Sequence, residues 1–179
     1  ELLGDLCVMR RRLEDAINHY DQALKLAPDN WSALSSKGIN LLRQGRETEG
    51  IAALERAYEN DPYNIWTVNT LRLVDSFERF ERSETPHFLI KLHRDEASVL
   101  APYVEPLLER SLTTIEERYG HEVDHRVVFE MYPDHEDFAV RTLGLPGLGA
   151  LGATFGRIVA MDSPQARERG EFHWASTLW

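Results

Sequence analysis

The sequence has a single cysteine, few basic residues and no long apolar run. Because Cys7 is the one cysteine among 179 residues, no disulfide can form within the chain, and nothing requires an oxidising compartment. No apolar stretch approaches the roughly 20 residues that a membrane-spanning helix needs, so we expect no membrane span. A cytoplasmic location is favoured, although no residue pattern assigns a compartment.

The shortage of basic residues bears on the partners that the chain can bind. Its 20 Lys and Arg residues stand against 30 Asp and Glu residues, which gives a formal charge of −10. Binding to phosphate groups requires clustered Lys and Arg side chains. The one basic run, Arg10-Arg11-Arg12, is interpreted as a solvent-exposed face. We therefore expect neither nucleic acid nor a membrane surface as a partner.

The first half of the chain contains an internal repeat with a period of 34 residues. Gly4 and Gly38 are separated by this interval, and so are Pro28 and Pro62. Glycine allows two helices to approach closely, whereas proline lacks the N–H group that would continue a helix. The pattern predicts helices over residues 1–9, 13–26, 31–43 and 47–60.

This pattern resembles the tetratricopeptide repeat, a pair of helices with a period of about 34 residues. The matching positions in the two copies are Leu3, Gly4, Ala16, Tyr20, Ala23, Pro28, Leu34, Gly38, Leu41, Leu54, Ala57 and Pro62. An apolar stripe through Leu71, Val74, Phe77 and Phe80 predicts one further helix over residues 65–82, which caps the array. We expect residues 1–82 to form an all-α solenoid of two repeats and this capping helix.

The resemblance implies a groove lined by the first helix of each repeat, which is where such repeats hold peptides. The residues expected to line it in the second copy are Ser32, Ser35, Ile39, Leu42 and Arg43. The Lys and Asn residues that grip a terminal carboxylate in the chaperone-binding type are missing. Two interpretations stay open: a weakly apolar groove for a peptide or a helix of a partner protein, or repeats that only pack on the second half.

The hydrophobic period changes after residue 82, and residues 83–179 are expected to form a second domain. Strand patterns cover residues 87–93, 126–132 and 156–161. Helical patterns cover residues 95–119, 134–140 and 172–179, and Gly120 is expected to end the first of these helices. This alternation is typical of an α/β domain, here a partial one, so the whole chain is predicted to be α+β.

One five-residue segment, His121-Glu122-Val123-Asp124-His125, has the spacing His-Glu-x-x-His. On a helix, this spacing places two imidazoles on one face, where they can bind the same zinc ion. However, Gly120 precedes the segment and a predicted strand follows it, so a helix is not expected here. We interpret the segment as a polar helix-to-strand connection, and we assign no catalytic or metal-binding residue in this chain.

The second half resembles the front part of a known enzyme family. The segments Phe138–Gly152 and Phe172–Trp179 are similar to segments of bacterial gluzincin-type zinc peptidase domains that carry tetratricopeptide repeats in front. In that family, the zinc motif follows the last of these segments directly. The resemblance implies a chain that is the front part of a zinc-dependent peptidase and is catalytically incomplete by itself. It needs no cofactor here, and zinc is expected in a longer parent protein.

The same resemblance implies a substrate-binding strand at the edge of the sheet, to which a substrate backbone adds as a further strand. Its residues are Arg157, Ile158, Val159, Ala160 and Met161. The alternative is a non-catalytic protein-interaction module whose second half is a degenerate peptidase-like scaffold. In either case, Trp174 and Leu178 should face the core, and self-association is expected through an exposed end near Trp179.

Overall fold

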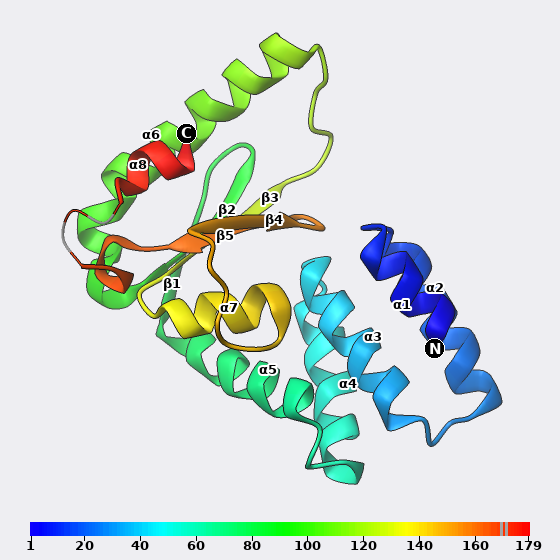
Figure 1. The fold of residues 1–179 in the computed structure, drawn as a ribbon. Coiled ribbons are helices and arrows are strands. Elements are labelled where there is room, and N and C mark those ends of the chain that lie inside the picture. Colours follow the sequence, from blue (N-terminus) through cyan, green and yellow to red (C-terminus); the bar gives the residue numbers. More distant parts are fainter. Residues whose placement is uncertain (169, 171) are drawn as a thin grey trace.

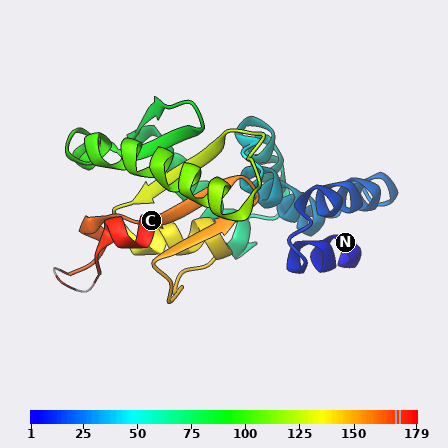
Figure 2. The same cartoon turned by 90° about the horizontal axis from the view of Figure 1, so that it is seen from above.

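The computed structural model describes residues 1–168, 170 and 172–179. In this part of the chain, the helices of the first half lie beside a sheet that has helices on both faces (Figure 1). A view from above shows that the repeat helices extend away from one end of this sheet (Figure 2). The chain therefore has an α+β fold, with a helical repeat segment followed by a mixed sheet.

The four repeat helices lie where the 34-residue pattern predicts them: α1 (Leu2–Met9), α2 (Leu13–Leu26), α3 (Trp31–Arg43) and α4 (Glu47–Asn60). An asparagine begins α3, and the equivalent asparagine in the next unit begins α5 (Ile65–Ser76). Asn30 Oδ1 accepts a hydrogen bond from the N–H of Ala33 at 3.0 Å, and Asn64 Oδ1 accepts one from the N–H of Trp66 at 3.1 Å. These caps satisfy N–H groups that have no partner within the helix.

Glycine residues allow α3 and α4 to pack closely. A Cβ atom built on Gly38 would lie 2.7 Å from Leu54 Cγ and 3.0 Å from the carbonyl oxygen of Gly50. A Cβ atom built on Gly50 would lie 2.8 Å from Leu42 Cγ and 2.9 Å from the carbonyl oxygen of Gly38. The prediction that Gly38 lies at a helix–helix contact is confirmed, and Gly50 fits the same contact because it is equally small.

The prediction that the capping helix continues to Arg82 is wrong. The helix α5 ends at Ser76, a 3-10 turn covers Phe77–Arg79, and residues Phe80–Glu84 form the strand β1. This strand pairs antiparallel with β2 over its whole length, from Phe80 opposite His93 to Glu84 opposite Leu89. Pairing with a distant segment has outweighed a short helical pattern here, as tertiary context commonly does. The strand β1 also crosses the boundary expected between residues 82 and 83.

The remaining elements are β2 (Phe88–His93), α6 (Arg94–Tyr119), β3 (Val127–Tyr132), α7 (His135–Leu143), β4 (Gly152–Phe155), β5 (Ile158–Asp162), a 3-10 turn (Pro164–Ala166) and α8 (Trp174–Leu178). The strand order in the sheet is β1-β2-β3-β5-β4. The three central strands are parallel, and the two outer strands are antiparallel to their neighbours. Gly120 ends α6 in the left-handed conformation, as predicted.

The prediction that residues 157–161 lie at the edge of the sheet is wrong. The strand β5 pairs with β3 on one side and with β4 on the other. The strand β4 was not predicted because it has only four residues and follows a loop rich in glycine and proline. Such short strands carry little periodicity, and their pairing partner determines their conformation.

The three central strands of the sheet are buried on both faces. One face packs against α6, through a cluster that includes Ile90, Phe129 and Val104. Trp174 and Leu178 pack against the same cluster from α8, as predicted. The other face packs against α5 and α7 through a second cluster. Its buried residues are Leu73, Phe77, Tyr132, Phe138, Ile158 and Ala160. In the described part of the chain, no helix is both long and apolar enough to cross a bilayer.

The contact between α3 and α4 gives a first testable prediction. Replacing Gly38 with leucine (Gly38→Leu) should destabilise the protein by about 1–3 kcal/mol, because the new side chain would overlap Leu54 and the backbone of Gly50. The measurement is the midpoint of urea unfolding. The control is Gly149→Leu, since a Cβ atom at Gly149 meets nothing within 4 Å. Equal midpoints for the two variants would contradict the proposed packing.

Candidate functional site

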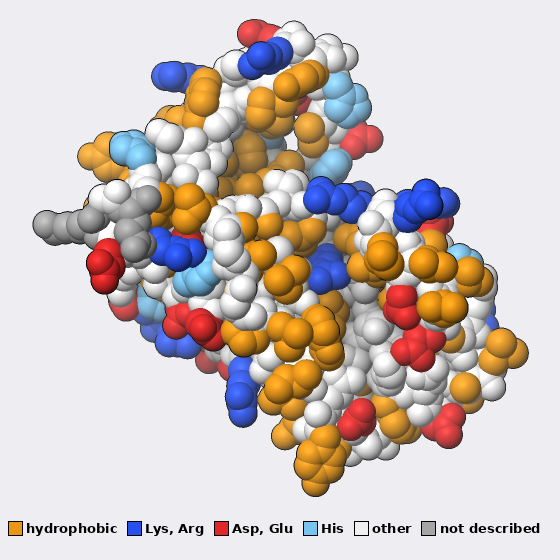
Figure 3. All heavy atoms as spheres, viewed as in Figure 1, with side chains coloured by type: hydrophobic (Ala, Val, Ile, Leu, Met, Phe, Trp, Pro, Cys, Tyr) orange, Lys and Arg blue, Asp and Glu red, His pale blue; other side chains and the backbone are white. Residues whose placement is uncertain are grey.

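A cavity of about 460 Å³ lies along α3, between the repeat helices and the start of α5. It is lined by Glu1, Asp5, Val8, Tyr20, Ser32, Ser35, Ser36, Ile39, Asn40, Arg43, Asn64, Trp66 and Leu143. We call this cavity the α3 groove. Four of the five residues expected from the sequence line it: Ser32, Ser35, Ile39 and Arg43. On this side of the molecule, acidic side chains stand near the N-terminus and hydrophobic side chains gather over α5 (Figure 3).

Leu42 has to be removed from the expected groove. Its side chain is buried, and it contacts α4 at Gly50. Residues four positions apart share one face of a helix, so Leu42 lies with Gly38 on the face that packs against α4. Ser35 lines the groove but is buried as well, and its hydroxyl oxygen lies 2.6 Å from Oγ1 of Thr67. Ser35 therefore joins α3 to α5.

One end of the α3 groove is acidic. The hydroxyl group of Ser32 donates to Glu1 Oε1 at 2.7 Å, and this hydrogen bond lowers the pKa of the Glu1 carboxyl group. The phenol of Tyr20 donates to Asp5 Oδ1 at 2.7 Å. Burial, followed by the hydrogen bond to Asp5, raises the pKa of Tyr20 well above its usual value. Tyr20 is therefore a neutral donor, and the Glu1 carboxylate keeps its negative charge at neutral pH.

The other end of the groove is formed by Arg43, the last residue of α3. Its Nη2 donates to the carbonyl oxygen of Thr142 at 2.9 Å, and its Nη1 donates to Oδ1 of Asn40 at 3.3 Å. Its Nε is buried and has no hydrogen-bond partner among the described residues. Burial, followed by the nearby charge of Arg141, lowers the pKa of Arg43 to about 10. Arg43 therefore still carries its positive charge at neutral pH.

The turn between β4 and β5 packs against the same end of α3. Gly156 in this turn has φ +56°, and a Cβ atom built on it would overlap the carbonyl oxygen of Arg43. Glycine is the residue that adopts this conformation without strain and leaves room for the approaching backbone. The N–H group of Arg157 donates to the same carbonyl oxygen at 3.4 Å. The hairpin of the sheet thereby fixes the position of Arg43.

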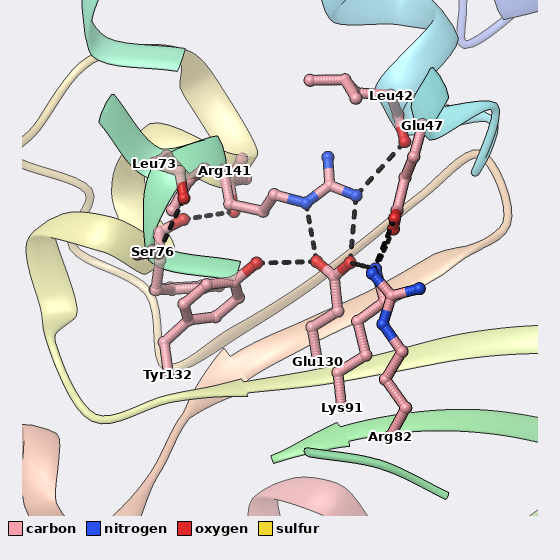
Figure 4. A network of polar contacts seen from close by, with 11 residues as sticks. Leu42, Glu47, Leu73, Ser76, Arg82, Lys91, Glu130, Tyr132 and Arg141 are labelled. Atoms are coloured by element: carbon pink, nitrogen blue, oxygen red, sulfur yellow. Dashed lines mark hydrogen bonds and ion pairs between the residues drawn. The ribbon is translucent and has the colours of Figure 1, made fainter. Parts of the chain in front are cut away.

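A buried ion-pair network lies between the end of α3 and the sheet (Figure 4). At its centre is Glu130 on β3, which is fully buried. Arg141 on α7 binds it with two nitrogens, Nε at 2.6 Å and Nη2 at 3.2 Å. Lys91 on β2 lies 3.2 Å from Glu130 Oε1, and the phenol of Tyr132 donates to Oε2 at 2.8 Å. Three polar side chains from three elements thus converge on one carboxylate.

The same network reaches the repeat helices. Arg141 Nη2 donates to the carbonyl oxygen of Leu42 at 3.2 Å, and Lys91 also forms an ion pair with Glu47 at the start of α4. Arg82 on β1 lies 3.1 Å from the other oxygen of Glu47. These contacts hold α3 and α4 against the sheet, so the groove and the sheet form one connected structure.

The sequence carried a signal for this network that was not used. Lys91 and Glu130 each stand in the middle of an otherwise apolar strand, and they are direct neighbours in the parallel pair β2–β3. Charged side chains are rarely buried unless they are paired. Two such residues in neighbouring strands predict a buried ion pair. Arg141 gave no comparable signal, because its helix is amphipathic and a charge is common there.

A second polar cluster holds the loop after α7 to the sheet. Asp162 at the end of β5 is buried, and it lies 2.9 Å from Nδ1 of His135 and 2.8 Å from Nε of Arg167. Nε2 of His135 donates to the carbonyl oxygen of Leu148 at 2.6 Å. These side chains form hydrogen bonds with one another and with the carbonyl oxygen of Leu148, so the cluster anchors the loop that follows α7.

The segment with the His-Glu-x-x-His spacing contains no helix, as predicted. His121 is exposed, and His125 lies next to the side chain of Asp124, with Nδ1 3.0 Å from Oδ1. Across the described residues, no three His, Cys, Asp or Glu side chains are arranged to hold a metal ion. The residues present therefore do not fit a zinc site.

The residues expected to bind substrate, 157–161, do not line the α3 groove. Ile158, Ala160 and Met161 are buried in the sheet, and Arg157 lies in the turn before β5. Val159 belongs to the same strand and packs partly buried on the α6 side. Because β5 has neighbours on both sides, a substrate strand cannot add to it directly. The unpaired edge on this side of the sheet belongs to β4.

The buried network gives a second prediction, on the dependence of stability on pH. Burial alone would raise the pKa of Glu130, but Arg141 and Lys91 outweigh burial and lower it to about 2. The unfolded value for a glutamate is about 4.3, so the network should stabilise the fold fully above that pH. As the pH falls from about 4 towards 2, this contribution should be lost.

The variant Glu130→Gln should lose about 3–5 kcal/mol of stability at pH 7, because it leaves Arg141 buried without a counter-charge and leaves Lys91 paired with Glu47 alone. It should also show a shallower loss of stability on acidification. Urea unfolding between pH 7 and pH 2.5 measures both effects. The exposed Glu55→Gln variant is the control. A Glu130→Gln profile that is parallel to that of the control would show that the network does not stabilise the fold.

Comparison with known proteins identifies the first part of the chain. A family model described as tetratricopeptide repeat matches residues 2–65, which include α1 to α4. Neither the curated proteins nor the solved structures compared with the chain gave a match. Tetratricopeptide repeats generally bind proteins, and the α3 groove lies in the matched residues for the most part. Residues 2–65 are therefore a tetratricopeptide-repeat segment, which indicates a protein-interaction module.

Proposed function

We propose that the chain binds a peptide segment of a partner protein in the α3 groove. The observation that carries this proposal is the cavity of about 460 Å³ along the first helix of the second repeat, lined by Ser32, Ile39 and Arg43. The lining combines apolar side chains with polar ones that can fix the orientation of a ligand. Binding sites of proteins combine apolar surface with placed polar groups in this way, and this groove is richer in polar groups than most.

The length of the groove limits the size of the ligand. Ser32 and Arg43 mark its two ends and lie on one helix. Eleven residues of α-helix rise by roughly 16 Å. An extended peptide covers this distance with about five residues, since a strand rises by about 3.3 Å per residue. A short linear segment therefore fits the groove better than a folded domain does.

Apolar contacts should supply most of the affinity. Ile39 is half-buried at the centre of α3, and Trp66 at the start of α5 is 42% exposed. Val8 and Leu143 complete the apolar part of the lining. Tryptophan is enriched among the residues that dominate binding energy at interfaces. We expect an apolar side chain of the ligand to lie between Ile39 and Trp66.

A second candidate function is enzymatic and concerns a longer protein. We propose that residues 83–179 are the front part of a zinc-dependent peptidase domain. The observation that favours it is the order of elements after β5, where α8 follows at the place that the resemblance implies. Because the described residues supply no zinc site, zinc would be held beyond Trp179 and this chain would be catalytically incomplete. As part of the same proposal, the protein is cytoplasmic, and this chain self-associates through its end near Trp179.

The enzymatic candidate is tested on a longer form of the protein that includes the residues encoded after Trp179. We expect one bound zinc per chain by metal analysis, and cleavage of peptides that a chelator abolishes. If the longer sequence contains no His-Glu-x-x-His motif, the enzymatic candidate is refuted. The non-catalytic scaffold then remains as the function of the second half.

Peptide binding in the groove gives a third prediction. Peptides selected from a displayed random library should bind the chain with a Kd that fluorescence anisotropy can measure. Ile39→Lys should weaken their binding at least about tenfold, which corresponds to about 1.4 kcal/mol, because it places a charge in the apolar part of the groove.

The matched control is Leu26→Lys, which adds the same charge at a side chain that is 89% exposed and lies outside the groove. Its affinity for the peptides should equal that of the unmodified chain. A library that yields no binding peptide would contradict the proposed function. Peptides that bind Ile39→Lys as tightly as Leu26→Lys would show that the binding surface lies elsewhere.

A further inference from the structure

The ring of His135, at the start of α7, has more polar neighbours than it can bind at the same time. Its Nδ1 lies 2.9 Å from Oδ2 of Asp162, which is an acceptor, and 2.8 Å from Nη2 of Arg167, which is a donor. Its Nε2 lies 2.6 Å from the carbonyl oxygen of Leu148. An imidazole nitrogen carries either a proton or a lone pair. Nδ1 can therefore form a hydrogen bond with only one of its two neighbours at a time.

The contact with Leu148 fixes the state of the other ring nitrogen. A carbonyl oxygen only accepts hydrogen bonds, so the distance of 2.6 Å requires a proton on Nε2. Nη2 of Arg167 also lies 3.1 Å from Nε2, but a nitrogen that carries a proton cannot accept a hydrogen bond from it. The neutral ring of His135 therefore has a lone pair on Nδ1, and the charged ring has a second proton there. The two states differ by one proton.

In the neutral state, the ring of His135 binds Arg167. Nη2 of Arg167 donates to the lone pair of Nδ1, and Nε of Arg167 donates to Oδ2 of Asp162 at 2.8 Å. Arg167 thus connects the start of α7 with the end of β5, and it holds the segment that follows the 3-10 turn Pro164–Ala166. This state has one unfavourable contact, because the lone pair of Nδ1 also faces the Asp162 oxygen without a proton between them.

In the protonated state, the ring of His135 binds Asp162 instead. The new N–H group on Nδ1 donates to the carboxylate, which gives a charge-assisted hydrogen bond. Nη2 of Arg167 then lies 2.8 Å from a nitrogen that no longer has a lone pair and belongs to a ring of the same charge. Asp162 is fully buried, whereas the side chain of Arg167 is 25% exposed. Arg167 is therefore the partner that can move into solvent.

The charges around His135 act in opposite directions. Asp162 on β5 favours the charged ring, whereas Arg167 and the positive end of the α7 dipole oppose it. The loop over residues 144–151 presents only the carbonyl oxygen of Leu148, because this loop has no titratable side chain. On α7 and the segments around it, the other charged groups are exposed or have one another as neighbours: Arg79, His93, Glu130, Asp134, Asp137, Arg141 and Glu168. Among the described residues, Asp162 and Arg167 are thus the charged groups in contact with the ring.

We infer that His135, Asp162 and Arg167 form a pH-sensitive switch that holds or releases the segment after β5. When His135 is neutral, the segment is held through Arg167. When His135 is protonated, Arg167 is released, while the hydrogen bond from Nε2 to Leu148 is kept. The switch therefore releases the segment after β5 and not the loop after α7. Because the released segment leads into α8, acidification loosens the connection between the sheet and this helix. The switch needs no ligand and is independent of peptide binding.

The test follows two side chains by NMR between pH 8 and pH 5, the range in which histidine side chains commonly change their charge. This range lies above the one in which the Glu130 network is lost, so the fold stays intact. The ¹³Cε1–¹H signal of His135 reports its protonation, and the ¹⁵Nε–¹H signal of Arg167 reports its binding to Asp162. Both signals should shift with the same midpoint. The ¹H–¹⁵N NOE of Arg167 should fall to less than about half of its initial value, because the released side chain moves freely in solvent.

The variant His135→Gln keeps the neutral arrangement at every pH, because an amide can donate to Leu148 and accept from Arg167 but gains no proton. The Arg167 signal should then stay unchanged over the same range. The matched control is His121→Gln, which removes an exposed histidine, and its Arg167 signal should shift as it does in the unmodified chain. An Arg167 shift of equal size in His135→Gln overturns the inference.

The unmodified chain decides the matter also where His135→Gln does not fold. The inference is overturned if the His135 signal does not move between pH 8 and pH 5. It is overturned as well if His135 becomes protonated while the Arg167 signal stays in place. The backbone NOE of Leu148 separates the switch from a general loosening: it should stay constant, and a fall as large as that of Arg167 would contradict the release of one segment alone.

Discussion

The buried carboxylate of Glu130 is the group on which the rest of the structure depends. It lies in the central strand β3, and its partners come from β2 and α7. Those partners in turn bind Leu42 and Glu47 on the repeat helices. If a buried charge loses its partners, its desolvation penalty is no longer compensated. Rearrangements that separate Glu130 from its partners are therefore strongly unfavourable. The network therefore fixes how the repeats lie on the sheet.

The helical first half could be predicted from the sequence because its information is local. Glycine, alanine and proline recur every 34 residues, and each acts within its own helix or on the next one. The strands β2 and β3 and the helix α6 were predicted for the same reason, since each has a long and regular pattern. The strands β1 and β4 could not be predicted. Each is short, and each is a strand only because a distant segment pairs with it.

The same distinction between local patterns and contacts with distant segments applies to the residues of the candidate site. Ser32, Ile39 and Arg43 follow from the helical period of α3, which places them on one side of the helix. Leu42 was predicted to line the groove, but it lies on the adjacent face of α3. That face packs against α4 through the contact of Gly38 with Gly50. The unusual state of Arg43 could not be predicted at all. It depends on Thr142, Arg141 and Gly156, which lie about a hundred residues later in the chain.

The direct passage from α5 into β1 has a practical consequence for dividing the protein. Only a 3-10 turn, Phe77–Arg79, separates the last repeat-side helix from the edge strand. A fragment that stops at residue 82 would carry three of the five residues of β1 without β2, whose pairing satisfies the backbone groups of β1. Unpaired strand segments are sites of aggregation. A fragment that stops at Ser76 leaves no such strand, although it loses the ion pair between Glu47 and Lys91.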